Sequence, residues 1–174
     1  MSLGIRELSA RAAIQDTIAR YCRAIDRRDF SLLRNVYHKD AIDEHAGMFS
    51  GTVDEFIPFV TEAIKAFERT THMLGQTLIS ISDEEAFSEA YFKASHVIKN
   101  NADGQSLVVV SGRYVDRHEM RNGEWRIAHR VTIIDWTAPP VPMSEQANAG
   151  QGLETLEVAG GDADLLPKRT PFFA

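Results

Sequence analysis

The sequence predicts a single α+β domain in which helices close one side of a curved antiparallel sheet around an apolar pocket. Apolar residues recur every three or four positions as far as about Thr70, which is the period of amphipathic helices. From there to about Trp136 the period is two, as in strands. Asn122-Gly123, between two alternating runs, predicts a tight hairpin turn between antiparallel strands. We therefore expect three helices followed by a meander of strands.

Each predicted helix has its own apolar stripe. The first helix runs from Ile5 to about Ile25, with charged residues on its other side. A short second helix follows Asp29, a residue type that commonly caps helix N-termini. The third helix begins near Thr52, where Glu55 three residues later completes a capping-box pattern.

Four strands follow, with short turns between them. They are expected at residues 71–81, 86–99, 106–120 and 124–136, and a further short strand is expected near 41–45. Before that short strand, His38-Lys39-Asp40 breaks the helical pattern. Residues 1–136 are thus predicted to be the folded domain and 137–174 an irregular tail, because the tail is rich in Pro and Gly and has no period. The apolar end Pro171-Phe-Phe-Ala174 is expected to dock on this subunit or a neighbour.

Composition narrows the function classes. The net charge of −6 and the absence of a basic stretch argue against a nucleic-acid partner. No apolar run near the N-terminus suits a signal peptide or a membrane span, so we expect a cytoplasmic protein that binds no membrane. The single cysteine, Cys22, cannot form an internal disulfide and is expected to be a small core residue.

The sequence offers no pattern for a cofactor or a metal. It has no Gly-rich phosphate loop, no nucleophile elbow and no zinc-ligand spacing. His38, Asp40, Asp43, Glu44 and His45 lie close together, but without a His pair at helical spacing they favour a surface loop over a metal site. We therefore expect chemistry that uses neither a cofactor nor a metal.

Four short motifs resemble stretches of a known group of proteins. They are Arg11-Ala-Ala-Ile-Gln-Asp16, Ile25-Asp26-Arg27-Arg28, Thr71-His72-Met73 and Gly123-Glu-Trp125-Arg-Ile. With three helices before a long sheet, the chain resembles the SnoaL-like members of the NTF2-like superfamily. The nearest group is that of scytalone dehydratase, gamma-hexachlorocyclohexane dehydrochlorinase and bile-acid 7α-dehydratase. The resemblance covers roughly residues 5–136 and implies a cone-shaped barrel of three N-terminal helices packed on a curved antiparallel sheet.

The resemblance implies that Asp26 and His72 form a catalytic pair. A carboxylate bonded to one imidazole nitrogen fixes the tautomer and favours the imidazolium, so the other nitrogen is a better base. Such a base removes a proton next to a carbonyl or a leaving group. Without the resemblance the two residues carry no signal, and a solvent-facing helix-end Asp26 and a structural His72 are the alternative.

Three further catalytic candidates come from the same resemblance, each with a structural alternative. Tyr21 would donate its hydroxyl to a substrate oxygen, or else be a core residue. His96 would act as a general acid, or else pack between sheet and helix. Arg130 would bind an oxygen anion, or else form a salt bridge to Asp26 or to another subunit.

Strand parity supplies the expected substrate-binding wall. Alternate residues that share a face on the last three strands include Phe92, Val110, Tyr114, Ile134 and Trp136. The resemblance adds His45 at the mouth of the pocket. No single member of the group matches everywhere: Tyr21, Ile25 and Ile134 stand where the dehydrochlorinase has Lys, scytalone dehydratase has Tyr and the bile-acid enzyme has Arg.

The expected function is that of a cofactor-independent lyase of the dehydratase type. It would act on a small, largely apolar compound with one or more rings. One alternative is an isomerase or polyketide cyclase that uses the same proton abstraction. Another is a non-catalytic binding module resembling the β-subunits of ring-hydroxylating dioxygenases. A homo-oligomer, trimer or dimer, is expected because the outer face of the sheet carries apolar residues.

Overall fold

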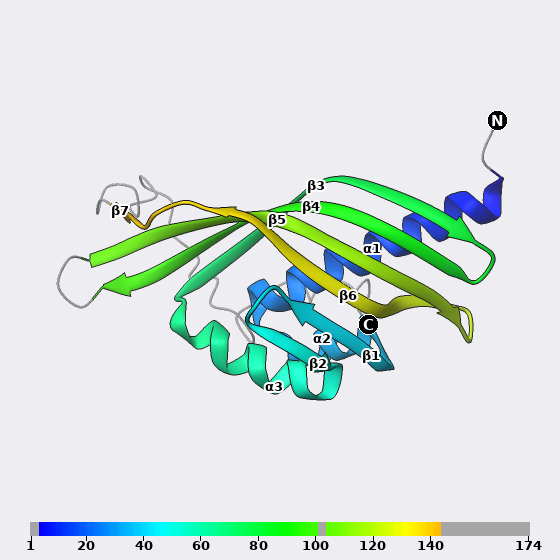
Figure 1. The fold of residues 1–174 in the computed structure, drawn as a ribbon, viewed down its shortest axis with the longest axis horizontal. Coiled ribbons are helices and arrows are strands. Elements are labelled where there is room, and N and C mark those ends of the chain that lie inside the picture. The colour runs from blue at the N-terminus through cyan, green and yellow to red at the C-terminus, as the bar shows by residue number, and fades with distance from the viewer. Residues whose placement is uncertain (1–3, 101–103, 144–174) are drawn as a thin grey trace, which may run out of the picture.

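The computed structural model describes residues 4–100 and 104–143. Within these ranges, helices pack on a curved, unclosed sheet, and the predicted α+β class is confirmed (Figure 1). The helices are α1 (Ile5–Arg27), α2 (Phe30–Asn35) and α3 (Val53–Ala63), with a 3₁₀ turn η1 (Ile64–Ala66) after the last. The strands are β1 (Tyr37–His45), β2 (Phe49–Thr52), β3 (Arg69–Ser82), β4 (Glu85–Asn100), β5 (Gly104–Arg121), β6 (Glu124–Thr137) and β7 (Val141–Met143).

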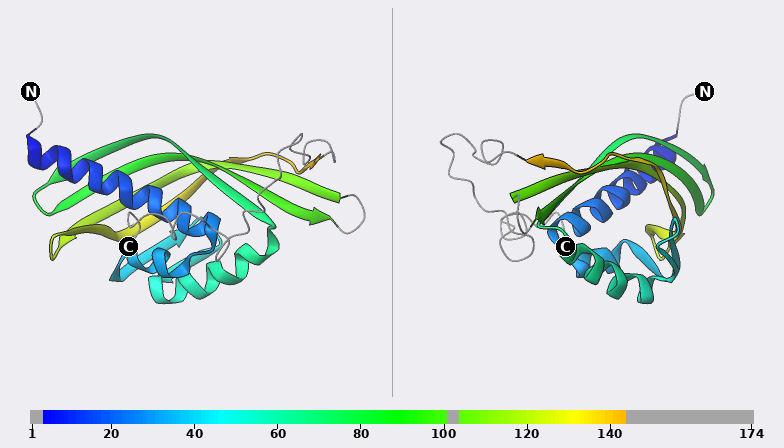
Figure 2. Two further views of the ribbon diagram at one scale, coloured as in Figure 1. Left: turned by 180° about the vertical axis from the view of Figure 1, so that it is seen from behind. Right: turned by 60° about the vertical axis from the view of Figure 1, so that its left-hand side comes forward.

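The sheet is mixed rather than wholly antiparallel. Its order is β2-β1-β6-β5-β4-β3, with β7 on β5, and β3 to β6 form the predicted antiparallel meander. The exception is β1, which pairs in parallel with β6. Figure 2 shows the sheet arching over α1, while α2, α3 and the β1–β2 hairpin close the other side. This concave arrangement forms the interior in which the site lies.

The segment after α2 differs from the prediction. Tyr37 and His38 begin strand β1, although the sequence indicates a helical stripe as far as Tyr37 and a break at 38–40. The cause is long-range pairing: the Ile127 amide donates to the Val36 carbonyl, and Tyr37 then lies opposite Ile127 on β6. A local period cannot report a partner strand so distant in sequence.

The junction between α1 and α2 fixes the end of α1, where Asp26 lies. Arg28 adopts a left-handed conformation with φ of 54°, and its side chain donates to the Phe67 carbonyl at 2.7 Å. Asp29 then caps α2, as predicted, by accepting from the Leu32 amide at 2.9 Å. Since Phe67 lies two residues before the start of β3, these contacts hold the last turn of α1 against the start of that strand.

Two irregularities in β6 change which of its residues face inward. Ala128 is skipped in the pairing with β5 between Ile127 and His129, and Asp135 is skipped between Ile134 and Trp136. Each extra residue reverses the faces of the residues after it, as a β-bulge does. Trp136 is consequently opposite Ser111 and is 49% exposed.

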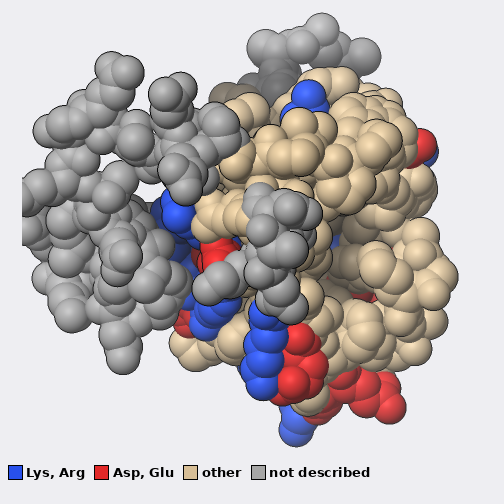
Figure 3. All heavy atoms as spheres, turned by 90° about the vertical axis from the view of Figure 1, so that its left-hand side faces the viewer, with Lys and Arg blue, Asp and Glu red and all other residues tan. Residues whose placement is uncertain are grey.

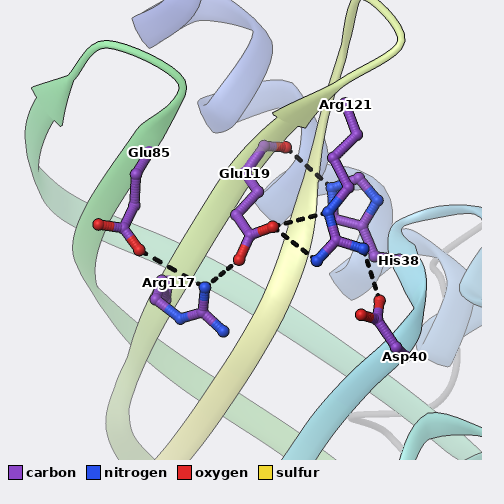
Figure 4. A network of polar contacts seen from close by, with 6 residues as sticks. All are labelled: His38, Asp40, Glu85, Arg117, Glu119 and Arg121. Carbon is purple, nitrogen blue, oxygen red and sulfur yellow. Dashed lines mark hydrogen bonds and ion pairs between the residues drawn. The ribbon is translucent and has the colours of Figure 1, made fainter.

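A polar network ties β1 to the far end of β5 (Figure 4). The His38 ring is 2.9 Å from the Glu119 carbonyl, and Arg121 donates to Asp40 at 2.6 Å and to Glu119. Arg117 also binds Glu119. His38 and Asp40 therefore lie in a strand and belong to a structural network, whereas the sequence suggested a surface loop.

The described surface carries charges of both signs. On the face drawn in Figure 3, Lys and Arg lie beside Asp and Glu, and uncharged side chains make up most of the described surface. Towards the C-terminus, the short strand β7 pairs with β5 within a segment predicted to be irregular. Residues 144–174 lie outside the described residues, as does the predicted docking of Pro171-Phe-Phe-Ala174.

Candidate active site

Asp26 and His72 form a close hydrogen-bonded pair between α1 and β3. The His72 Nδ1 lies 2.7 Å from Asp26 Oδ1, and the His72 backbone amide donates to Oδ2 at 2.8 Å. The Thr70 hydroxyl donates to Oδ1 at 3.0 Å. Only 9% of the His72 side chain and 12% of the Asp26 side chain are exposed. Thr70 and His72 on β3 thus hold the Asp26 carboxylate in place, and the carboxylate in turn orients the His72 ring.

The surroundings keep this pair polarised. Burial alone would raise the pKa of Asp26, but the hydrogen bonds and charge of His72, with the Thr70 hydroxyl, outweigh it, and the net pKa is lowered. Asp26 is therefore a carboxylate at neutral pH and accepts a proton-bearing Nδ1. Among the described residues, no group hydrogen-bonds the His72 Nε2. That nitrogen is available as a base.

The His72 side of the pair lines a cavity of about 250 Å³ between α1, α3 and the concave side of the sheet, and Asp26 lies behind His72, outside this lining. Its lining is largely apolar and comprises Tyr21, Ile25, His45, Met48, Phe56, Phe59, Val60, Ala63, Ile64, Phe67, His72, Phe92, Ala94, His96, Val108, Val110, Tyr114, Thr132 and Ile134. Five residues predicted for the wall are in this set: His45, Phe92, Val110, Tyr114 and Ile134. Trp136 is not in it, since the bulge at Asp135 turns that side chain to the outer face.

Tyr21 also lines the cavity and keeps its proton. Its ring meets those of Tyr37 and Tyr114 edge to face, with centroids 6.2 and 5.3 Å away. Burial, and secondly the charge of Asp43, raise the pKa of Tyr21 well above its ordinary value. The hydroxyl can therefore donate a hydrogen bond but does not ionise.

Arg130 lies behind the tyrosines rather than in the lining. Its guanidinium donates to both oxygens of Asp116, at 2.8 and 2.6 Å, and both side chains are 0% exposed. The guanidinium carbon lies 3.9 Å from the Tyr21 ring centroid and 4.1 Å from that of Tyr114. The salt-bridge partner is thus Asp116, and Arg130 fixes the position of two rings that do line the cavity.

His96 stands beside the dyad. Its ring is perpendicular to that of His72 with centroids 5.7 Å apart, and it packs on Phe67 at 4.5 Å. Burial, and secondly the charge of His72, lower the pKa of His96 to about 4. At neutral pH this ring is uncharged, which does not favour the acid role predicted for it.

A second buried polar group was not predicted from the sequence. Asp43 on β1 accepts from the Tyr37 hydroxyl and contacts the His45 ring, each at 2.5 Å, and the carboxylate is 0% exposed. The available signal was Asp43-Glu-His45 in a predicted strand, where residues two apart share a face. The residue types of this cluster favour a surface loop over a metal site, and the resemblance indicates only His45 at the mouth of the pocket.

Because His118 is buried, we expect the free energy of unfolding to depend on pH. Its ring is 0% exposed and 2.9 Å from the Ser88 hydroxyl, and burial lowers its pKa to about 4 from 6.5. The unfolded chain therefore binds a proton between pH 6.5 and 4 that the folded chain does not, so the free energy of unfolding falls as the pH falls through this window. We expect wild type to lose roughly 2 kcal/mol more than His118→Gln over this range.

Urea unfolding at several pH values measures this difference. His129→Gln is the matched control, because that ring lies on a partly exposed surface beside Glu44. Parallel pH profiles for wild type and His118→Gln would contradict the assignment.

Neither a metal site nor a membrane-spanning helix is found in the part of the chain that the structure describes. Among these residues, no group of three or more His, Cys, Asp or Glu is arranged to hold a metal ion. No helix within the described ranges is both long and apolar enough to cross a membrane.

The sequence is similar to a known protein family and to two mycobacterial proteins. The SnoaL-like domain family matches residues 6–131. The Mycobacterium tuberculosis protein Rv2910c and the Mycobacterium bovis protein Mb2934c are each 30% identical over 132 residues, covering 74% of this chain and 88% of theirs. The chain therefore belongs to the SnoaL-like family.

Solved structures show the same NTF2-like fold. A hexachlorocyclohexane dehydrochlorinase (LinA type 2) superposes with a TM-score of 0.69 at 18% identity, covering 77% of this chain and 90% of that one. The Kribbella flavida protein Kfla4162 gives 0.68 at 17%, covering 75% and 94%. A scytalone dehydratase-like protein of Novosphingobium aromaticivorans gives 0.65 at 20%, covering 79% and 89%. Together with the family match over residues 6–131, this agreement in fold confirms the predicted SnoaL-like resemblance.

Proposed function

We propose that this SnoaL-like protein is a cofactor-independent lyase of the dehydratase type. The observation that carries the proposal is the His72 imidazole, held by Asp26 through Nδ1 while its ring lines an apolar cavity. A base of this kind is suited to removing a proton from carbon next to a carbonyl group. The same geometry favours an enzyme over a non-catalytic binding module, which would need neither the dyad nor the cavity.

In the proposed reaction, each polar group has one task. His72 takes the proton, and Asp26 stabilises the imidazolium that forms. The Tyr21 hydroxyl donates to the developing enolate oxygen. The Thr132 hydroxyl, which is buried in the lining without a hydrogen-bond partner among the described residues, offers a second polar contact.

The cavity limits the substrate class. Its volume of about 250 Å³ and its apolar, aromatic lining suit a compound of one or two rings with few polar groups. The similar structures include a dehydrochlorinase and a dehydratase-like protein, whose names both describe eliminations. These names support elimination over the isomerase or cyclase alternative, in which no leaving group departs. Analysis of the products distinguishes elimination from isomerisation or cyclisation, because only elimination releases a leaving group.

Exchange of carbon-bound protons in D₂O tests the base without a known leaving group. Cyclohexanone, 1-indanone, 1-tetralone and 2-tetralone are incubated with the protein, and loss of the α-proton signal is followed by NMR. We expect wild type to exchange at least one ketone over ~100-fold faster than His72→Gln. His129→Gln, with a partly exposed imidazole, should match wild type. If no ketone exchanges faster with wild type than with His72→Gln, the proposal is wrong.

We also propose that the chain forms a homo-oligomer. Met73 and Leu78 on β3, with Phe87 on β4, are 69%, 67% and 54% exposed on the outer face of the sheet. Leu78 and Phe87 are diagonal neighbours across β3 and β4, and Met73 lies further along β3; exposed apolar side chains on this face support association.

A further inference from the structure

A second carboxylate–imidazole pair, Asp43–His45, contributes to the same cavity from another part of the sheet. Its strand, β1, is separated from the His72 strand, β3, by β6, β5 and β4. His45 and His72 nevertheless both belong to the lining of one cavity, on the concave side of the sheet. The two dyads therefore approach the same space from different walls.

Hydrogen bonds to both carboxylate oxygens fix the position of Asp43 in the second pair. Asp43 is 0% exposed, and each of its oxygens has its own partner at 2.5 Å: the His45 Nδ1 and the Tyr37 hydroxyl. A carboxylate buried in this way costs several kcal/mol unless its partners satisfy it. Tyr37 is itself 0% exposed and is held in an edge-to-face contact with Phe56, with centroids 6.3 Å apart. An apolar residue at position 43 would serve the core with less cost.

The other side of the His45 ring is turned to the cavity. With Nδ1 committed to Asp43, Nε2 lies 3.5 Å from the Tyr21 hydroxyl, and 15% of the side chain is exposed. The ring stacks on Phe56 with centroids 5.0 Å apart and an angle of 19° between planes. His45 therefore has a fixed orientation, a carboxylate on one ring nitrogen, and the other nitrogen beside the substrate space.

We propose that His45 is the general acid of the reaction, with Asp43 and Tyr37 as its positioning residues. This inference rests on the proposed role of His72 as the base. His72 Nε2 takes the proton next to the carbonyl, and that C–H electron pair forms a carbon–carbon double bond. The bond to the β-oxygen breaks, and the departing oxygen takes the Nε2 proton of the His45 imidazolium. The products are an unsaturated ketone and water, and one proton returns from His72 to His45 through solvent.

The other candidate acids fit this task less well. His96 packs against His72 itself, has no carboxylate partner among the described residues and is neutral at pH 7 because its pKa is lowered to about 4. Tyr21 holds its proton too firmly to transfer it, because its pKa is raised by burial. A substrate that needs His45 carries a hydroxyl on the carbon β to a carbonyl, since hydroxide is a poor leaving group without a proton.

The dependence on the leaving group tests the inference. Three probes are used: cyclohexanone for proton exchange, and 3-hydroxycyclohexanone and 3-acetoxycyclohexanone for elimination to cyclohexenone, followed by absorbance. We expect His45→Gln to slow the loss of hydroxide at least ~100-fold and to slow exchange by a factor about ten times smaller or less. Loss of acetate should slow less than about tenfold, because acetate leaves without a proton. Asp43→Asn should show the same pattern. If Asp43→Asn does not fold, His45→Gln alone decides the test.

The matched control is His129→Gln, which removes an imidazole paired with Glu44 at 2.7 Å outside the cavity lining. The inference is overturned if His45→Gln leaves hydroxide loss within about threefold of wild type, or if it slows exchange and both eliminations equally. Failure of the proposed function has a different signature: exchange that does not depend on His72. In that case the inference fails with it.

Discussion

Replacement of Asp26 by Asn should lower the rate of ketone proton exchange by about 10³- to 10⁴-fold. The Asn side chain has one acceptor oxygen and one NH2 donor, so it cannot accept from both the ring Nδ1–H and the backbone amide of His72. It is also uncharged, so it neither fixes the productive tautomer nor stabilises the imidazolium. We expect a loss of about 1–3 kcal/mol in unfolding free energy, because the amide keeps one acceptor oxygen and at least one donor from β3 loses its partner. Proton exchange by NMR and urea unfolding measure the two effects.

Asp16→Asn is the control, because it makes the same change on α1 at a side chain that is 71% exposed. It should leave exchange unaltered. A rate for Asp26→Asn within about tenfold of wild type would remove the carboxylate from the mechanism.

Replacement of Asp116 by Ala should produce the largest loss of stability, about 3–5 kcal/mol. The change leaves the Arg130 guanidinium buried among aromatic rings without its bidentate partner. The double variant Asp116→Ala/Arg130→Met should recover part of the loss, because the unpaired charge is then gone. Urea unfolding of the two single variants and the double variant gives the coupling energy.

The exposed pair Arg126–Glu124 provides the comparison on the same strand as Arg130, and Arg126→Met should cost less than about 1 kcal/mol. If Asp116→Ala lowered the unfolding free energy by no more than this, the Asp116–Arg130 pair would not be what holds the Tyr21 and Tyr114 rings in place.

The sequence predicts the long meander well because each of its strands alternates regularly and is joined by a short turn. The predicted end of α2 was wrong since β1 is defined by a partner strand far along the chain, and apolar Tyr37 suits a helix stripe as well as a strand. Strand parity failed at Trp136 for a related reason. A single extra residue at Asp135 reverses the face, and no local pattern marks it.

Some residues of the candidate site could likewise be predicted from the sequence, and others depend on tertiary structure. Asp26 and His72 carry no spacing signal, and only the resemblance connects them. The roles of Asp43 and Tyr37 were missed, because burial of a carboxylate depends on tertiary partners and the residue type alone suggests solvent. Arg130 was singled out correctly as an inward residue, but its partner on β5 follows from register, which the bulge at Ala128 sets.

The parallel pairing of β1 with β6 has a consequence for the order of folding. During synthesis, α1 and β1 emerge long before β6, so β1 has only its hairpin partner β2 until most of the domain is made. The strand that bears His45 reaches its place only when the last long strand docks. Assembly of the cavity is therefore a late, non-local step, and slow closure of the concave face should accompany the final stage of refolding.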